Sequence, residues 1–289
     1  MRILVLMHEY QRSKRGEYVI DALKEEWEKK GIQITIIFGT KERPEADLLI
    51  PHIDLTHRPP EYEDFIKSYP NVINRNVLDL SKRRISKNLL SGNEDYSGPV
   101  IVKTDNNCCG RPDANAYRRK HPFRSWVSKR AASIGETVLR KPMRWRKILP
   151  KYPVYDSIKE VPTGVWKNQA LVVEKFLPEK EGDYYYIRLY MFLGDCSRSL
   201  REASLEPFVK SRTYIGITEI IPVPDELLQF RRELGLDYGK IDYVVHEGQV
   251  EILDVSQTLG IGPKKIETPE SVIDFSDLAD GIWSFLPSK

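Results

Sequence analysis

The chain has 289 residues, of which 40% are hydrophobic and 30% charged, long enough for two or three small lobes around a hydrophobic core. It has no apolar run of membrane-spanning length, and its first apolar run lacks a signal-peptide cleavage pattern. The three cysteines, two of them adjacent, form neither a disulfide framework nor a zinc spacing, which indicates a reduced, cytoplasmic protein.

The positive charge is concentrated in one segment. Residues 118–151 contain twelve lysines and arginines but a single acid, Glu136, so this segment carries +11 and the remainder of the +3 chain carries −8. Aromatic residues are interleaved through the whole basic block, about 117–151. This composition suits nucleic acid, an anionic membrane face or a polyanionic substrate, and equally a solvated insert. The block has no recognisable nucleic-acid-binding motif, which argues against nucleic acid as the partner.

Residues 1–76 alternate between strand and helix patterns. Apolar runs at 2–7, 33–38 and 46–55 predict strands, and residues 18–30 predict an amphipathic helix, with a further short helix around Phe65 and Ile66. The strand–helix–strand order predicts a parallel sheet. No Gly-x-Gly-x-x-Gly follows the first strand, so a dinucleotide site of that kind is not expected.

Three polar residues, His52, Asp54 and His57, follow the third predicted strand at a spacing that resembles a metal site. Ligands do bind at the carboxyl ends of parallel strands. A turn that closes the sheet explains the same residues more simply. We therefore keep them only as possible substrate contacts.

The next segment predicts a short basic helix within 78–90 that starts near Ser81, a loop at 91–98 and an apolar strand that ends in Lys103. From a strand end, a lysine ammonium can reach a phosphate, although a surface lysine with a buried stem fits the pattern too. The polar loop at 104–110 has the small residues needed to wrap a phosphate with backbone N–H groups.

Residues 171–195 predict two strands, and the second carries Arg188 among aromatic residues. A half-buried arginine needs an anion, either a partner carboxylate or a ligand phosphate. Residues 224–235 predict a capped helix, and residues 271–285 a closing amphipathic helix.

Residues 239–260 predict a hairpin that carries Asp242 on one strand and Glu251 and Asp254 on the other. Carboxylates on adjacent strands can converge on one cation, and magnesium prefers such hard oxygen ligands. A surface hairpin with solvated acids remains open as the alternative on this segment alone.

Taken in order, these elements resemble the ATP-grasp superfamily, as a divergent member similar to its carboxylate–amine ligases. The resemblance extends over about 74–260. Its motifs are Leu-Asp-Leu-Ser-Lys82, Gly-Pro-Val-Ile-Val-Lys103, Glu174-Lys175-Phe176-Leu177, Ile-Arg188-Leu-Tyr, and the hairpin with Asp242 and Asp254.

The resemblance implies an α/β fold in which an N-terminal Rossmann-like, pre-ATP-grasp domain is followed by a two-lobed α+β ATP-grasp domain. The implied boundaries are 1–76 for the first domain, 77–175 for the small lobe with the basic insert at about 117–151, and 176–289 for the C-terminal lobe with the metal hairpin.

The resemblance also implies which residues contact ATP. The phosphates are assigned to Lys82, less directly Lys87, and Lys103, the adenine to Glu174, Lys175, Phe176 and Leu177, and the ribose to Glu181. Arg188 resembles the cation that meets the transferred phosphoryl group or the reaction's oxyanion.

Asp242 and Asp254 resemble the family's magnesium ligands, but the pattern departs from the family at the next position. Ser256 stands where an asparagine ligand is expected, which puts a second magnesium in doubt unless Gln257 reaches it. The glycine-rich phosphate flap is also missing in its usual form. The loop from Asp105 into the basic block stands in its place, as a lid over the phosphates or over an anionic co-substrate.

The expected function is therefore an ATP- and magnesium-dependent ligase. Such an enzyme activates a carboxylate of a small molecule or peptide as an acyl phosphate, and an amine or thiol then displaces the phosphate. The alternatives are a degenerate ATP-grasp protein that binds nucleotide in a regulatory role, and a polyanion-binding module that uses the basic block. Phosphoryl transfer to another acceptor, a kinase activity, is also open.

Overall fold

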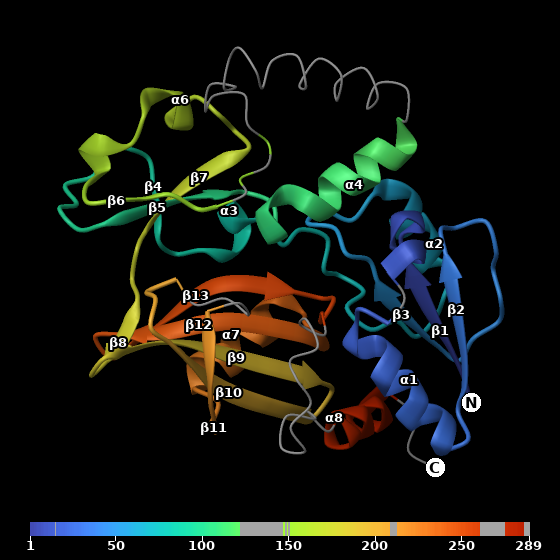
Figure 1. Cartoon of the computed structure of the whole chain (residues 1–289). Helices are drawn as coiled ribbons and strands as arrows, with labels where there is room; N and C mark the ends of the chain where they lie inside the picture. The colour runs from blue at the N-terminus through green and yellow to red at the C-terminus, as the bar shows by residue number, and fades with distance from the viewer. Residues whose placement is uncertain are drawn as a thin grey trace. The chain divides into compact units, whose positions relative to one another are not determined.

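The computed structural model describes residues 1–14, 16–121, 147, 149, 151–208, 213–260 and 275–285, and Figure 1 labels its elements. The chain forms two compact units. Unit 1 comprises Met1–Asp54, Arg58–Leu78 and Pro178–Lys289, and unit 2 comprises Leu55–His57 and Asp79–Leu177. No helix within the described ranges is long and apolar enough to cross a membrane.

Unit 1 begins with a three-stranded parallel sheet in the order β2-β1-β3, which confirms the predicted parallel pairing. Its strands are β1 (Arg2–Met7), β2 (Gln33–Phe38) and β3 (Leu48–His52). The accompanying helices are the 3-10 helix η1 (Glu9–Lys14), α1 (Val19–Lys29) and α2 (Pro60–Lys67).

The second sheet of unit 1 is antiparallel, in the order β11-β10-β9-β12-β13, with β8 paired to β9. Its strands are β8 (Glu179–Glu181), β9 (Tyr184–Leu193), β10 (Cys196–Ser204), β11 (Tyr214–Ile220), β12 (Tyr238–His246) and β13 (Gln249–Ser256). The helices of this region are α7 (Asp225–Leu234), α8 (Ser276–Asp280) and the 3-10 helix η5 (Gly281–Phe285).

The predicted acidic hairpin is confirmed as β12–β13. Its two-residue turn is Glu247–Gly248, and both residues adopt positive φ angles of 50° and 80°. Two successive left-handed residues match the twist of an antiparallel pair, which is why a glycine is placed here.

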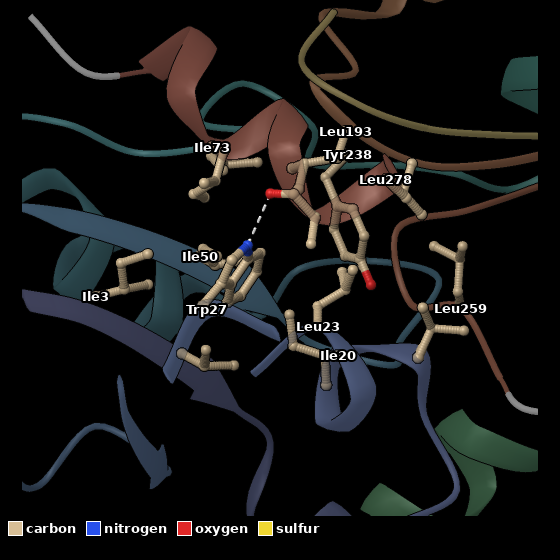
Figure 2. Close-up of a cluster of buried hydrophobic side chains, with 14 of the residues drawn as sticks. Ile3, Ile20, Leu23, Trp27, Ile50, Ile73, Leu193, Tyr238, Leu259 and Leu278 are labelled. Atoms are coloured by element: carbon tan, nitrogen blue, oxygen red, sulfur yellow. Dashed lines mark hydrogen bonds between the residues drawn. The ribbon is translucent and has the colours of Figure 1, made fainter. Parts of the chain in front are cut away.

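Both sheets of unit 1 contribute to one hydrophobic core (Figure 2). Trp27 of α1 is fully buried there, and its indole N–H donates to the carbonyl of Ala279 in α8 at 2.9 Å. Leu193 of β9 and Tyr238 of β12 join the same core. Residues 1–54 and 178–289 are therefore held together by shared apolar burial, the dominant favourable term in folding.

Unit 2 is built on a four-stranded antiparallel sheet in the order β4-β7-β5-β6. The strands are β4 (Leu89–Leu90), β5 (Val100–Thr104), β6 (Val154–Tyr155) and β7 (Leu171–Lys175). Short helices complete it: α3 (Lys82–Ile85), η2 (Cys108–Gly110), α4 (Arg111–Lys120), η4 (Ile158–Glu160) and α6 (Thr163–Trp166).

The short basic helix expected to start near Ser81 is confirmed as α3, but it ends earlier than the segment 78–90 suggested. It is a single turn, α3, because Ser86 returns to an extended conformation and Leu89–Leu90 then pair with β7. Of the basic block at 117–151, only residues 117–121, 147, 149 and 151 are described, so the expected lid lies largely outside the described residues.

Candidate functional site

Lys103 and Glu174 form a buried ion pair in the sheet of unit 2. The Lys103 ammonium lies 2.6 Å from Glu174 Oε2, and the two side chains are 7% and 3% exposed. The strand register explains the contact: Ile101 of β5 is opposite Glu174 of β7, which puts Lys103 on the same face, two residues along. The sequence suggested separate roles for these residues, and the structure brings them together.

One oxygen of Glu174 has no hydrogen-bond partner among the described residues. Oε1 is buried and accepts no hydrogen bond within the part of the chain that the structure describes. A buried, unpaired carboxylate oxygen is costly, and ligand-binding positions are where such an acceptor is tolerated. The lone acceptor beside a buried ammonium therefore fits a ligand that brings an N–H donor, as the amino group of adenine does.

The residues after Glu174 are partly engaged by the sheet. The N–H of Lys175 donates to Asn88 O at 3.0 Å, and that of Phe176 donates to Pro99 O at 2.9 Å. The Lys175 ammonium lies 5.3 Å from the centre of the Tyr96 ring. These contacts hold residues 175–176, part of the expected adenine segment, against β4 and the start of β5.

Lys82 is a second buried lysine of unit 2. It is 2% exposed, and its ammonium donates to Asn107 Oδ1 at 2.7 Å. Its backbone N–H is fixed by the carbonyl of Asp105 at 2.9 Å. The predicted phosphate-wrapping loop and the predicted phosphate lysine are thus in contact, since Asp105 and Asn107 both belong to that loop.

In unit 1, Arg188 of β9 has a carboxylate partner. Its guanidinium donates to Glu179 of β8 through Nε at 2.9 and 3.1 Å and through Nη2 at 2.8 Å. Arg201 of β10, directly opposite Arg188, donates to Glu179 from its own Nε at 2.9 Å. The backbone N–H of Val245 is a third donor residue, at 2.7 Å from Glu179 Oε2. Glu179 therefore keeps two arginines of like charge side by side.

These contacts set the protonation of Glu179. Burial raises the pKa of its carboxyl, but the hydrogen bonds from Arg188 and Val245 and the charges of both arginines outweigh burial and leave the pKa below its ordinary value. Glu181, which is expected at the ribose, pairs with Arg201, and its side chain is 70% exposed.

The two predicted metal carboxylates lie directly across the hairpin from one another. Asp242 of β12 is opposite Asp254 of β13, and the register shifts at the next residue, Tyr243. Like charges at opposed positions destabilise a strand pair unless a cation lies beside them. Here Lys240 provides one, with its ammonium 2.8 Å from Asp242 Oδ1. Two opposed carboxylates are a donor set that suits magnesium.

Ser256 and Gln257 have other partners. The Ser256 hydroxyl donates to the carbonyl of Thr258 at 2.7 Å and accepts the N–H of Thr258 at 3.1 Å. Gln257 is buried, and its amide N–H donates to Ile53 O at 3.2 Å. Across the described ranges, no group of three or more His, Cys, Asp and Glu gathers as a metal site. The hairpin therefore presents the carboxylates of Asp242 and Asp254 as candidate metal ligands, while the Ser256 hydroxyl is hydrogen-bonded to the backbone of Thr258.

His52, Asp54 and His57, kept as possible substrate contacts, are divided between the two units. His52 is fully buried in unit 1, whereas His57 belongs to unit 2 and lies 3.3 Å from Asp79. Burial lowers the pKa of His52 to about 3, so this imidazole is neutral at physiological pH.

Sequence reasoning missed Glu179, Asn107 and Lys240, which hold the predicted arginine, lysine and aspartate. Glu179 lies in Pro-Glu-Lys-Glu-Gly-Asp, which reads as a plain connection. The usable signal was Arg188 itself, because a half-buried arginine on a strand demands a carboxylate nearby.

No family model matches the chain, and no curated protein matches it. Among solved structures, the macrocyclase MdnC bound with precursor peptide MdnA from Microcystis aeruginosa MRC is similar, with 11% identity over 100% of both chains and a TM-score of 0.51. A RimK domain protein ATP-grasp from Sphaerobacter thermophilus DSM 20745 matches at 11% identity over 99% of each chain, with a TM-score of 0.49. D-alanine–D-alanine ligase from Bacillus anthracis matches at 17% identity over 99% of this chain and 97% of that chain, with a TM-score of 0.46.

These likenesses concern the fold alone, and the first one spans both whole chains. The chain is a mixed α/β protein with several sheets, similar to ATP-grasp ligases at low identity. The predicted resemblance to the ATP-grasp superfamily is confirmed at the level of the fold.

Proposed function

We propose that this chain is an ATP- and magnesium-dependent ligase that activates a substrate carboxylate as an acyl phosphate and joins it to an amine or a thiol. The observation that carries the proposal is the buried pair of Lys103 and Glu174, with an unpartnered acceptor at Glu174 Oε1. The fold likeness to ATP-grasp ligases supports the reaction class.

In the proposal, residues of unit 2 contact the adenine and the phosphates. Glu174 Oε1 accepts a hydrogen bond from the adenine amino group, while residues 175–177 line the base. An ammonium group has three N–H donors, and the ion pair uses one of those on Lys103. The remaining donors, together with Lys82, offset the charge of the phosphates, which is most of what phosphoryl transfer requires of a protein. Glu181 is the proposed ribose contact.

In the same proposal, unit 1 binds the cation and stabilises the charge that develops. Asp242 and Asp254 would hold magnesium, which neutralises phosphate charge when bound. Ser256 is the third proposed position, although its hydroxyl is held by Thr258. Arg188, kept in one orientation by Glu179, is the proposed cation for the transferred phosphoryl group or the tetrahedral oxyanion.

The proposed substrate is a carboxylate on a small molecule or a peptide. The macrocyclase MdnC is described as bound with a precursor peptide, and this likeness makes a peptide the first class to examine.

The test is a thermal-shift titration with ATP, with and without magnesium, on the wild-type chain and on Glu174→Gln. Binding to the native state alone raises apparent stability by about 2.7 kcal/mol at a hundredfold excess over Kd. We expect a magnesium-enhanced shift with the wild type and a smaller ATP shift with Glu174→Gln. GTP, which lacks the 6-amino group, serves as the ligand control. An absent ATP shift in the folded wild type would contradict the proposal.

A further inference from the structure

Lys14 places its ammonium group in a cluster of side chains that resembles a receptor for a cation. Its Nζ lies 3.8 Å from Asp54 Oδ2, 5.5 Å from the centre of the Tyr10 ring and 5.9 Å from that of Tyr18. A carboxylate with two aromatic rings within about 6 Å is a favourable environment for an ammonium group. We call Tyr10, Tyr18 and Asp54 the Asp54 cage.

Asp54 is oriented by neutral donors. Tyr10 and Tyr18 donate to Asp54 Oδ2 at 2.5 and 2.9 Å, and Thr258 donates to Oδ1 at 3.2 Å. Burial, and then the charge of Asp54, raises the pKa of both tyrosines, so they remain protonated donors at neutral pH. None of these three donors is a cation, whereas the ammonium group of Lys14 lies 3.8 Å from the same carboxylate.

The cage lies where ligands bind in parallel α/β sheets. Tyr10 follows β1, and Asp54 is two residues beyond β3, so both lie past the carboxyl ends of parallel strands. Tyr18 is bridged to Gly260, in the segment that follows β13. Thr258 connects Asp54 to Ser256, which ends the strand that carries Asp254.

Buried polar atoms without partners lie beside the cage. The fully buried imidazole of His52 packs edge-on against Tyr18, with ring centroids 5.0 Å apart, and neither of its nitrogens has a hydrogen-bond partner among the described residues. Gln257 Oε1 is likewise unpartnered within that part of the chain, although its amide is tied to Ile53, next to Asp54. Buried polar groups are normally satisfied, so unused hydrogen-bonding capacity here points to a polar ligand.

We propose that the Asp54 cage is a binding site for a primary ammonium group, which the chain's own Lys14 occupies in the free protein and a substrate amine occupies in its place. The carboxylate supplies the charge, and the two rings supply cation–π attraction and exclude water from one side. The inference rests on the proposed ligase function only for the identity of the ligand, the amine that joins the activated carboxylate. The cage itself is defined by the described contacts.

The experiment empties the cage and refills it from solution. Lys14→Ala removes the resident ammonium, and n-propylammonium chloride is titrated while apparent Tm is followed at constant ionic strength. We expect a saturable rise in Tm that n-propanol, its neutral counterpart, does not reproduce. In Lys14→Ala/Asp54→Asn the half-saturating concentration should rise tenfold or more. Tyr18→Phe in the Lys14→Ala background provides a milder second variant if the first double variant does not fold.

Lys30→Ala is the matched control. Lys30 pairs with Asp280 and is 31% exposed, close to the 29% of Lys14, but the pair lies on the surface, with Asp280 52% exposed. The proposal would be overturned if n-propylammonium raised the apparent Tm of Lys30→Ala and Lys14→Ala equally. It would also be overturned if n-propanol raised the apparent Tm of Lys14→Ala as much as n-propylammonium does.

An ATP titration of the same proteins separates the two proposals. An ATP shift in the wild type without a specific n-propylammonium response in Lys14→Ala overturns the cage and leaves the ligase proposal standing. A specific n-propylammonium response in Lys14→Ala without an ATP shift in the wild type supports the ammonium site. That result overturns the proposal that the bound amine is a ligation substrate.

Discussion

Replacing Lys103 with methionine tests the ion pair on which the proposed nucleotide site depends. Methionine keeps most of the apolar stem but removes the ammonium, so Glu174, with a side chain only 3% exposed, is left without its cation. At the 2.6 Å separation of the pair, the attraction is about 6 kcal/mol at an effective dielectric constant of 20. Desolvation of the two charges offsets part of it, and breaking such a pair from one side costs about 3–5 kcal/mol.

The assay is urea denaturation of four proteins: the wild type, Lys103→Met, Glu174→Gln and the double variant. We expect Lys103→Met to lose about 3–5 kcal/mol of unfolding free energy, or about 10 °C in apparent Tm. The double variant should recover much of that loss, because it leaves no buried charge unpaired. A loss below about 1 kcal/mol in Lys103→Met, or single-variant effects that add within about 0.5 kcal/mol, would refute the buried pair.

Three further changes have defined outcomes. Glu179→Gln should destabilise the chain by about 2–4 kcal/mol at neutral pH, because two arginines lose their shared anion. The folded pKa of Glu179 lies below the ordinary 4.5, so the difference in unfolding free energy between the wild type and Glu179→Gln should shrink only as the pH falls below 4.5. A difference that stays unchanged in acid would contradict the role of Glu179. Asp242→Asn should keep the ATP shift and lose its magnesium enhancement in the thermal-shift assay; full enhancement would remove the hairpin as the metal site. Below pH 6.5 the His52 imidazole takes up a proton in the unfolded chain but not in the folded chain, where its pKa is about 3. The wild type should therefore lose up to about 1.4 kcal/mol of unfolding free energy per pH unit below pH 6.5. His52→Phe removes this contribution, so its stability should fall less steeply over the same pH range. Equal slopes for the two proteins would show that His52 is not the cause.

Local patterns were enough to predict most strands and the acidic hairpin. The alternation in residues 239–256 and the Glu247–Gly248 turn depend on neighbours a few positions apart, so a single sequence contains the whole signal. The parallel pairing of β1 with β2 and β3 was predictable for a related reason, since a helix between two strands returns the chain in the same direction.

The extent of the short elements depended on contacts far along the chain. The run at 78–90 has helical spacing, yet Leu89–Leu90 form a strand because they pair antiparallel with β7, more than eighty residues later in the chain. Tertiary pairing overrides local preference where the local preference is weak.

The sequence by itself predicted five site residues, Lys103, Glu174, Arg188, Asp242 and Asp254. The tertiary structure alone decided their partners: Glu174 beside Lys103, Glu179 beneath Arg188, and Lys240 next to Asp242. It also decided that residues 1–54 share a core with 178–289, where Trp27 of α1 reaches Ala279. The physical reason is that residue type and periodicity are local, whereas a charge's partner is set by strand register and by which apolar faces are buried together.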